Sequence, residues 1–296
     1  MTRFLSVVGA LLAGLLVWGV AEPYRLVVER REARVPGLPP SWEGRLVALL
    51  SDLHIGMLSG NRLTASRAVK RIVEARPDLA LLAGDFIHDN RSGISDAVAL
   101  VRTLVRAGVP VYAVLGNHDY AMPTRNAQGD RSLAQELARA LTAAGARVLH
   151  NEAVALQRGD GVADERLYLV GIGAHTPGED RPCEALERVP DGAPRLVMMH
   201  HPASFDALPP CSAPFAVAGH THGGQVRLPL TPLWRYLTYV KEVEVFVAGW
   251  IRSGMIDGYG QEGNNLYVSR GIGCSVAPLR LFCPPEVTLF TLRRAA

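Results

Sequence analysis

Short apolar segments alternate with amphipathic ones along the first half of the chain, and this alternation limits the possible folds more than any other feature. Three segments are apolar over nearly their whole length, as strands buried on both faces are: residues 45–50, 79–83 and 109–115. Each is followed by a segment with helical periodicity: residues 62–75, 95–107 and 132–144. Three such strand–helix units predict an α/β fold with a largely parallel, buried sheet.

The second half of the chain is richer in strand-like segments, which we expect at residues 167–172, 195–199, 215–218, 266–269 and 287–292. Polar residues follow five of the predicted strands at the point where each strand ends. They lie in the blocks Asp52-Leu53-His54, Gly84-Asp85, Gly116-Asn117-His118-Asp119, His200-His201 and Gly219-His220-Thr221-His222. Because ligands bind at the carboxyl ends of strands in open α/β sheets, the pattern predicts one shared site.

Seven of these side chains are candidate metal ligands: Asp52, His54, Asp85, Asn117, His200, His220 and His222. Carboxylate, imidazole and amide groups suit divalent ions such as Mn, Fe or Zn. The i, i+2 spacing of the Asp52/His54 and His220/His222 pairs would turn both members of each pair to one side of a strand. Seven ligands fit two ions that share a carboxylate, the arrangement that clamps the attacking and leaving oxygens of a phosphoryl transfer.

The five blocks, in this order, resemble those of the calcineurin-like metallophosphoesterases, and the resemblance extends over about residues 46–292. It implies a four-layer α-β-β-α sandwich, in which two mixed sheets are flanked by helices. The apolar N-terminus and Ser269-Arg270-Gly271 further resemble a bacterial membrane-associated branch, which includes phosphodiesterases and phosphatases, with a lipid-sugar pyrophosphatase among related enzymes.

The resemblance also implies a division of the ligands between two divalent ions. One ion is expected on Asp52, His54 and His222. The second is expected on Asn117, His200 and His220, with Asp85 bridging the two. Mn is the favoured metal, with Fe and Zn as alternatives. A hydroxide that bridges the ions is then the expected nucleophile.

Catalytic roles follow from the same resemblance. His118 is expected to protonate the leaving oxygen. Asp119 either orients His118 or caps the following turn. The family commonly carries Asp three residues after the bridging Asp, where this chain has His88 followed by Asp89. We expect this departure to alter the surroundings of the metals and to leave metal binding intact.

The histidines leave one question of register open. His200 and His201 are adjacent, and neighbouring strand residues face opposite ways, so only one of the two is expected to be a ligand. The pattern His-x-Pro favours His200. His88, His150 and His175 lie outside the blocks, and we expect ordinary hydrogen-bonding roles for them.

Substrate-binding residues are less well specified by the sequence. Arg270 and Arg280 can clamp a phosphate, because guanidinium groups match phosphoryl oxygens, or they can form structural ion pairs. Gly223 and Gly224 either bring backbone amides to the phosphate or form a turn. The aromatic stretch at residues 228–240 has three open interpretations: a membrane contact, a lid over the site, or core packing.

The chain is expected to consist of three segments, of which the first is an apolar N-terminus. Residues 1–21 include the uncharged run Phe4–Ala21, which predicts a membrane anchor in the bacterial cytoplasmic membrane, with a cleaved signal peptide as the alternative. Residues 22–44 are expected to be a polar tether, and residues 45–296 the metallophosphoesterase domain. Arginines after the run favour a cytoplasmic domain, whereas the terminal position of the run favours export. The side of the membrane therefore stays open.

Composition excludes several classes of function. The net charge is +3, from 31 Lys and Arg against 28 Asp and Glu, and no basic stripe is present, which argues against binding of duplex nucleic acid. The 4 cysteines form no Cys-x-x-Cys pair, which argues against a zinc–cysteine site. The expected activity is hydrolysis of a phosphodiester or phosphomonoester, with a lipid-linked phosphate as one candidate substrate. The alternative is a non-catalytic, membrane-tethered module that binds metal or phosphate; the complete ligand set argues against it. The oligomeric state is not encoded in any feature that we identify.

Overall fold

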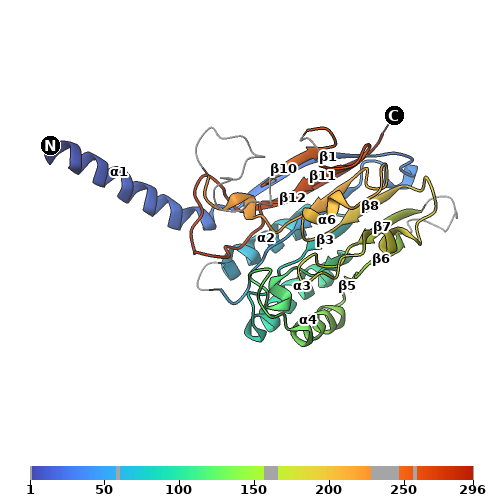
Figure 1. The fold of residues 1–296 in the computed structure, drawn as a ribbon, viewed down its shortest axis with the longest axis horizontal. Helices are drawn as coiled ribbons and strands as arrows, with labels where there is room; N and C mark the ends of the chain where they lie inside the picture. Colours follow the sequence, from blue (N-terminus) through green and yellow to red (C-terminus); the bar gives the residue numbers. More distant parts are fainter. Residues whose placement is uncertain (1, 58–60, 157–165, 228–246, 256–258, 296) are drawn as a thin grey trace.

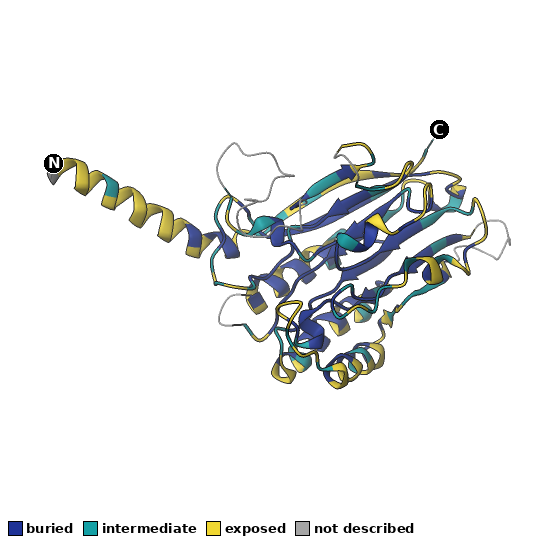
Figure 2. Ribbon diagram, in the orientation of Figure 1, coloured by how far each residue is buried: buried dark blue, intermediate teal, exposed yellow. Residues whose placement is uncertain are grey.

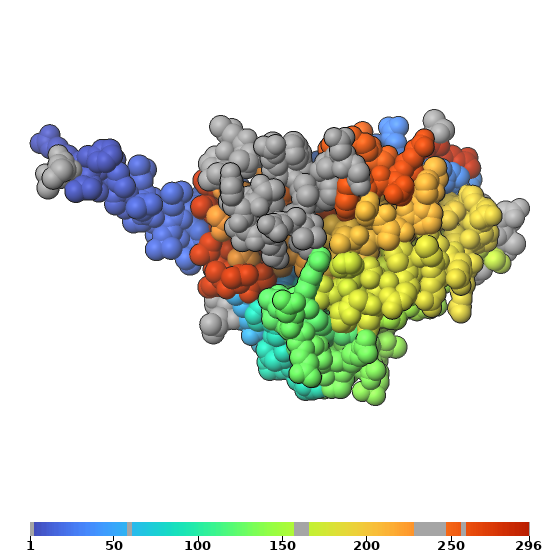
Figure 3. Space-filling model, in the orientation of Figure 1, coloured from blue at the N-terminus to red at the C-terminus, as the bar shows by residue number. Residues whose placement is uncertain are grey.

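Two six-stranded sheets, packed face to face, form the body of the molecule (Figure 1). The computed structural model describes residues 2–57, 61–156, 166–227, 247–255 and 259–295. The aromatic stretch at 228–240 lies outside the described residues. Helix α1 (Thr2–Ala21) projects from the body, as the space-filling view shows (Figure 3).

The first sheet has the strand order β1-β12-β2-β3-β4-β5. Its strands are β1 (Val27–Val35), β2 (Leu46–Leu50), β3 (Leu79–Ala83), β4 (Val111–Val114), β5 (Arg147–Val148) and β12 (Glu286–Arg294). Strands β2 to β5 pair in parallel, as the strand–helix alternation predicts, and β12 is antiparallel to β2. The outer face is covered by helices α2 (Asn61–Ala75), α3 (Ile94–Arg106) and α4 (Arg131–Ala143).

The second sheet has the strand order β10-β11-β9-β8-β7-β6. Its strands are β6 (Glu152–Leu156), β7 (Leu167–Gly171), β8 (Arg195–Met198), β9 (Ala216–Ala218), β10 (Gly249–Arg252) and β11 (Asn265–Val268). The edge strands β6 and β10 are antiparallel to their neighbours. Two short helices, α5 (Pro182–Leu186) and α6 (Ala203–Asp206), lie on its outer face. Both sheets are mixed, which confirms the predicted four-layer sandwich.

The continuous apolar strands are explained by burial on both of their faces (Figure 2). In β2, Val47 and Leu49 pack between the sheets, whereas Ala48 and Leu50 pack under the helices. The layer between the sheets holds an aromatic group centred on Phe290, whose ring lies 4.9 Å from Phe215 and 5.0 Å from Tyr267. Side chains at alternating positions therefore fill two cores at once.

The segment that the sequence predicts to be a tether contains a strand, so the boundary at residue 45 is wrong. β1 pairs in parallel with β12 from Val27 opposite Glu286 to Val35 opposite Arg294. Only Ala33 and Val35 of this strand are buried. The charged residues at five of the other seven positions hide the strand pattern, and they suit an edge strand, because charges there discourage pairing with another chain. The folded body therefore begins before β1.

Helix α1 is apolar and almost wholly exposed (Figure 2). The apolar span at Arg3–Tyr24 has a mean hydropathy of 2.3 and is 6% buried, so it is long and apolar enough to cross a membrane. The end of α1 is joined to the body, because the backbone N–H of Arg280 donates to the carbonyl of Gly19 at 2.9 Å. The span is thus an apolar N-terminal helix, and it is not part of a core.

We expect Phe290→Ala to lower the free energy of unfolding by about 3–5 kcal/mol, because truncation leaves a cavity between the two sheets. Denaturant titration of the full chain in a mild detergent measures this loss. The control is Val276→Ala, at a residue that is 92% exposed. A loss below about 1 kcal/mol for Phe290→Ala would show that the aromatic group does not hold the sheets together.

Candidate metal centre

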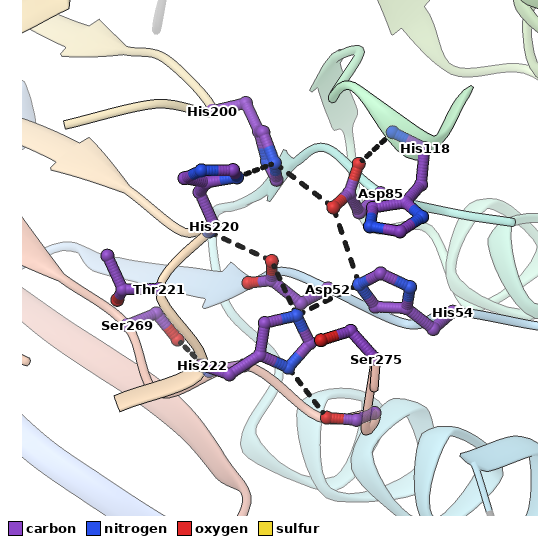
Figure 4. Close-up of polar contacts among 12 residues, drawn as sticks. Asp52, His54, Asp85, His118, His200, His220, Thr221, His222, Ser269 and Ser275 are labelled. Atoms are coloured by element: carbon purple, nitrogen blue, oxygen red, sulfur yellow. Dashed lines mark hydrogen bonds and ion pairs between the residues drawn. The ribbon is translucent and has the colours of Figure 1, made fainter. Parts of the chain in front are cut away.

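Six of the seven predicted ligands, all except Asn117, are labelled in Figure 4, where they converge at the carboxyl ends of strands from both sheets. Asp52 and His54 follow β2, Asp85 follows β3 and Asn117 follows β4 of the first sheet. The remaining three follow strands of the second sheet: His200 after β8, and His220 and His222 after β9. Segments far apart in the sequence therefore meet because the two sheets are stacked with these strand ends at one edge.

A first group contains Asp52, His54, Asp85 and His222, whose ligand atoms all lie within 4.8 Å of one another. All four residues are buried. The Nε2 atoms of His54 and His222 face each other at 2.9 Å, and His222 Nε2 lies 3.6 Å from an Asp52 carboxylate oxygen. This group contains the three predicted ligands of one metal and the predicted bridge.

A second group contains His200, His201 and His220. His220 Nδ1 lies 3.2 Å from His200 Nε2, and His200 Nε2 lies 3.1 Å from Asp85 Oδ2. The same Asp85 oxygen lies 3.3 Å from His54 Nε2 of the first group. One carboxylate oxygen is therefore shared between the two groups, at the position predicted for a bridging ligand.

Three buried oxygens at this centre accept no hydrogen bond from any described residue: Asp52 Oδ2, Asp85 Oδ2 and Asn117 Oδ1. Buried oxygens without a partner are rare and costly, and a divalent cation satisfies them. His200 Nδ1 donates to the carbonyl of Ala83 at 2.7 Å, and His222 Nδ1 donates to that of Gly273 at 2.9 Å. Their Nε2 lone pairs are thereby left to bind a metal. The donor set fits Mn, Fe or Zn.

The electrostatics of the centre favour bound cations. Burial lowers the pKa of His54 and of His222, which keeps both imidazoles in the neutral form that ligates metals. Burial opposes the ionisation of Asp85, but the charges on His200 and His118 hold its pKa well below the usual range. Burial also opposes a charge on His200, yet the Asp85 carboxylate raises the pKa of His200 to about 9. The centre thus stabilises positive charge although burial disfavours it, and such a site is suited to divalent ions.

Most of the ligands lie on strained backbone just past the strand ends, so the expected i, i+2 geometry of a strand does not apply. Asp52, His54, Asp85, His220 and His222 all have positive φ, between 45° and 73°. The left-handed region is unfavourable for residues with a Cβ, at a cost of about 1–3 kcal/mol each. Hydrogen bonds between the loops hold these conformations, and the strain aims the side chains at one point.

Two glycines of the blocks are required by close packing. A Cβ on Gly116 would lie 2.2 Å from Asp85 Oδ1, and a Cβ on Gly219 would lie 2.5 Å from Asp52 Oδ2. No side chain fits at either position without moving a predicted metal ligand. The glycines therefore do more than allow a turn: they leave room for the two carboxylates.

His118 lies beside the first group, with its ring 4.5 Å from that of His54. Its Nδ1 lies 2.9 Å from an oxygen of Asp89, which is the residue that orients it. Burial lowers the pKa of His118, but the charge on Asp85 and the hydrogen bond with Asp89 outweigh burial and raise it. A raised pKa favours the protonated form that a proton donor needs.

The sequence leaves two roles open for Asp119, orienting His118 or capping the following turn, and its described hydrogen bonds serve neither role. The Asp119 carboxylate instead accepts hydrogen bonds from the backbone N–H groups of Asp85, Phe86, Ile87 and Gly116, at 2.8–3.1 Å. Burial and the neighbouring charge of Asp85 raise the pKa of Asp119 to about 7. Asp119 thus fixes the loops that carry Asp85 and His118, and Asp89 takes the orienting position.

Two histidines that the sequence placed outside the ligand set lie at the centre. His88 Nδ1 is 3.2 Å from His54 Nδ1, and the His88 ring stacks on that of His118. His201 is buried beside His220, with ring centroids 4.1 Å apart. The position of His88 in the sequence, three residues after Asp85, is the feature that indicates that its side chain lies near the centre. His200 alone of the adjacent pair contacts Asp85 within the described part of the chain, in keeping with the favoured register.

The remaining histidines have ordinary partners. His175 Nδ1 lies 2.9 Å from a carboxylate oxygen of Asp180, and His150 Nε2 lies 3.8 Å from one of Glu179. Neither histidine belongs to a metal-binding group in the described part of the chain. They fill the structural roles that the sequence predicts for them.

The structure contradicts the predicted phosphate clamps. Arg280 is fully buried, and its guanidinium donates to the carbonyls of Gly273 at 2.6 Å and Cys283 at 3.1 Å. Arg270 pairs with Glu286 at 2.8 Å and with Glu29 at 3.0 Å. Both guanidinium groups thus bind protein carbonyls or carboxylates, which agrees with the structural alternative.

The glycines after His222 form a turn. The backbone N–H of Gly224 donates to the carbonyl of Thr221 at 2.8 Å, so it does not point at a phosphate. Gly223 is buried, and a Cβ there would lie 2.6 Å from the sulfur of Cys283. The turn alternative therefore describes both residues.

Comparison with known proteins agrees with this geometry. Residues 46–224 match the family model of the calcineurin-like phosphoesterases. The chain is 31% identical to phosphodiesterase YaeI of Escherichia coli over 83% of this chain and 81% of that protein. It is 24% identical to the UDP-2,3-diacylglucosamine pyrophosphatase LpxG of Chlamydia muridarum, over 96% and 95% of the two chains.

Among solved structures, a dimetal phosphatase from Danio rerio matches 80% of this chain and 90% of its own, with 13% identity and a TM-score of 0.44. A likeness at that level says nothing about function. The family model, in contrast, covers more than half of the chain and contains the blocks around all seven predicted ligands. The protein belongs to the calcineurin-like phosphoesterases, a family of metal-dependent hydrolases of phosphoester bonds.

Proposed function

We propose that this chain hydrolyses phosphodiesters or phosphomonoesters with two divalent ions, of which Mn is the favoured kind. The observation that carries the proposal is the position of Asp85 Oδ2, which lies 3.3 Å from His54 Nε2 and 3.1 Å from His200 Nε2. In our proposal Asp52, His54 and His222 hold one ion and Asn117, His200 and His220 hold the other. Asp85 is the ligand of both.

The ions, when bound, supply Lewis-acid polarisation of the phosphoryl group and activation of water at neutral pH. The chain supplies the positioning of the reacting groups and the proton. His118 donates the proton to the leaving oxygen, and Asp89 holds its ring through Nδ1, which leaves Nε2 to face the substrate. Asp119 keeps the two loops in register through its four backbone hydrogen bonds.

The alternative is a non-catalytic module that binds metal or phosphate. A module of that kind has no use for a proton donor. The 2.9 Å contact of Asp89 with His118 favours catalysis, because it builds an oriented acid next to the ligands. We therefore prefer the hydrolase.

We further propose that α1 anchors the chain in the bacterial cytoplasmic membrane and that the substrate is lipid-linked. Helix α2 begins at the metal centre, where Asn61 Nδ2 donates to the carbonyl of His54 at 3.1 Å. One helical turn later, Thr64 Oγ1 donates to the carbonyl of Pro23 at 2.8 Å, directly after α1. The centre thus lies near the end of the apolar helix. The pyrophosphatase named among the relatives acts, by its name, on a diacylated nucleotide sugar.

The first test is hydrolysis of aryl phosphomonoesters and phosphodiesters by the full chain in a non-ionic detergent. We expect no turnover after chelation and recovery with Mn²⁺. Asp85→Asn should abolish the recovery of turnover with Mn²⁺, because the substitution weakens the shared ligand. Glu184→Gln, at an exposed carboxylate, should retain this recovery. Lack of metal-dependent turnover on either substrate class would contradict the proposed reaction.

The second test concerns the proton donor. We expect Asp89→Asn to lower kcat by about a hundredfold for esters with a basic alcohol as leaving group, with little change in KM. Esters of nitrophenol need less protonation of the leaving oxygen, so their loss should be at least tenfold smaller. Asp191→Asn, at an exposed carboxylate, is the control. An equal loss for both leaving groups would count against proton donation by His118.

The third test concerns His88, whose Nδ1 faces that of His54. We expect His88→Leu to weaken metal binding by about tenfold, because His54 loses the partner that fixes its ring. His88→Asn, whose side-chain oxygen can replace Nδ1, should retain most of the affinity. Metal titration followed by calorimetry measures both, with His150→Leu as the control. An unchanged metal affinity in His88→Leu would show that His88 does not position His54 for metal binding.

A further inference from the structure

A basic pocket lies beside the C-terminal end of α1, and none of its lining residues belongs to the groups that contain the metal ligands. Its volume is about 390 Å³. One wall is the segment from Tyr24 to Leu26, which follows α1, and the other wall is α2. Helix α2 contributes Arg67, Lys70, Arg71 and Glu74. Figure 1 shows that α1 enters the body next to α2.

The pocket carries more positive charge than its one carboxylate can balance. Arg67, Lys70 and Arg71 have the i, i+3, i+4 spacing that places residues on one face of a helix. Arg71 is paired with Glu74 at 3.0 Å. Lys70 makes no ion pair within the described part of the chain, and Arg67 donates only to the carbonyl of Tyr24, at 3.3 Å. Two cations are therefore left for an anionic ligand, whereas Arg25 at the opposite wall is paired with Glu22 at 3.9 Å.

The position of the pocket is fixed relative to α1. The hydrogen bond from Thr64 to the carbonyl of Pro23 holds α2 against the end of the apolar span. Arg25 is also held there, because its guanidinium lies 5.6 Å above the ring of Trp18. Both walls of the pocket are therefore joined to the end of the apolar span.

The apolar span ends where the pocket begins, since the span runs to Tyr24 and the wall of the pocket runs from Tyr24 to Leu26. Two residues extend the chain by at most about 7 Å. The headgroup layer on each side of a bilayer is about 5–8 Å thick. With α1 across the bilayer, as proposed above, the guanidinium of Arg67, which donates to the carbonyl of Tyr24, lies near the depth of the lipid phosphates.

We propose that this pocket binds the phosphate of an anionic glycerophospholipid from the surrounding membrane. Guanidinium groups match phosphoryl oxygens with paired hydrogen bonds, and an ammonium group adds a point charge. The bound lipid fixes the rotation of the body about α1, so that the metal centre at the start of α2 keeps one orientation towards the membrane. This role is separate from the hydrolysis of the substrate.

Native mass spectrometry of the full chain in a non-ionic detergent tests the proposal. The chain is titrated with phosphatidylglycerol and with phosphatidylcholine of the same acyl chains. We expect at least tenfold tighter retention of phosphatidylglycerol. The pocket variant combines Arg67→Gln, Lys70→Gln and Arg71→Gln and should bring this retention down to the level of phosphatidylcholine.

The matched control combines Arg102→Gln, Arg106→Gln and Arg139→Gln, at exposed residues of α3 and α4, and removes the same charge. It should keep the preference for phosphatidylglycerol, and both variants should hydrolyse soluble aryl phosphates at the rate of the parent chain. Should the pocket variant not fold, Lys70→Gln alone should weaken retention by about threefold.

Three results would overturn the proposal. The first is an unchanged preference in the pocket variant, and the second is an equal loss in both variants, which would reflect overall charge. The third is cleavage of residues 1–21 from the chain made in bacterial cells, because the pocket would then have no membrane span beside it. Displacement of the lipid by an equal concentration of glycerol phosphate would show a site for soluble phosphate and would also contradict the assignment.

Discussion

The contact of the Asp85 carboxylate with histidines from both halves of the chain is the interaction on which the centre depends. His54 follows a strand of the first sheet and His200 follows a strand of the second, and both Nε2 atoms lie within 3.3 Å of the same oxygen. This oxygen and two other buried oxygens at the centre, Asp52 Oδ2 and Asn117 Oδ1, accept no hydrogen bond from the described residues. Binding of cations would offset the cost of burying them and would thereby stabilise the folded chain.

The rest of the site is built to keep that carboxylate in place. Strained backbone at the strand ends aims the ligands inward, and two glycines leave the space that the carboxylates fill. Asp119 accepts four backbone hydrogen bonds, and Arg280 ties together the carbonyls of the last loop. Charged groups that the sequence suggests for substrate binding thus hold the loops.

The sequence predicts those parts of the fold that are marked by a pattern among neighbouring residues. Strands β2 and β3 are continuous apolar runs because both faces are buried, and the polar residues that follow them are visible as motifs. Strand β1 is missed, because charges such as Glu29 and Arg30 on an edge strand conceal its alternation. Asp89 is missed as the partner of His118, since Asp119 is adjacent in the chain and only the fold shows that Asp89 is adjacent in space. A buried arginine such as Arg280 likewise has no local signal that separates it from a phosphate clamp.

Anomalous X-ray diffraction from crystals of the full chain grown with Mn²⁺ tests the central claim most directly. Our account predicts two anomalous peaks about 3.5–4 Å apart, both within bonding distance of the Asp85 carboxylate. One peak should contact His54 and the other His200. A single peak, or two peaks of which only one contacts Asp85, would contradict it.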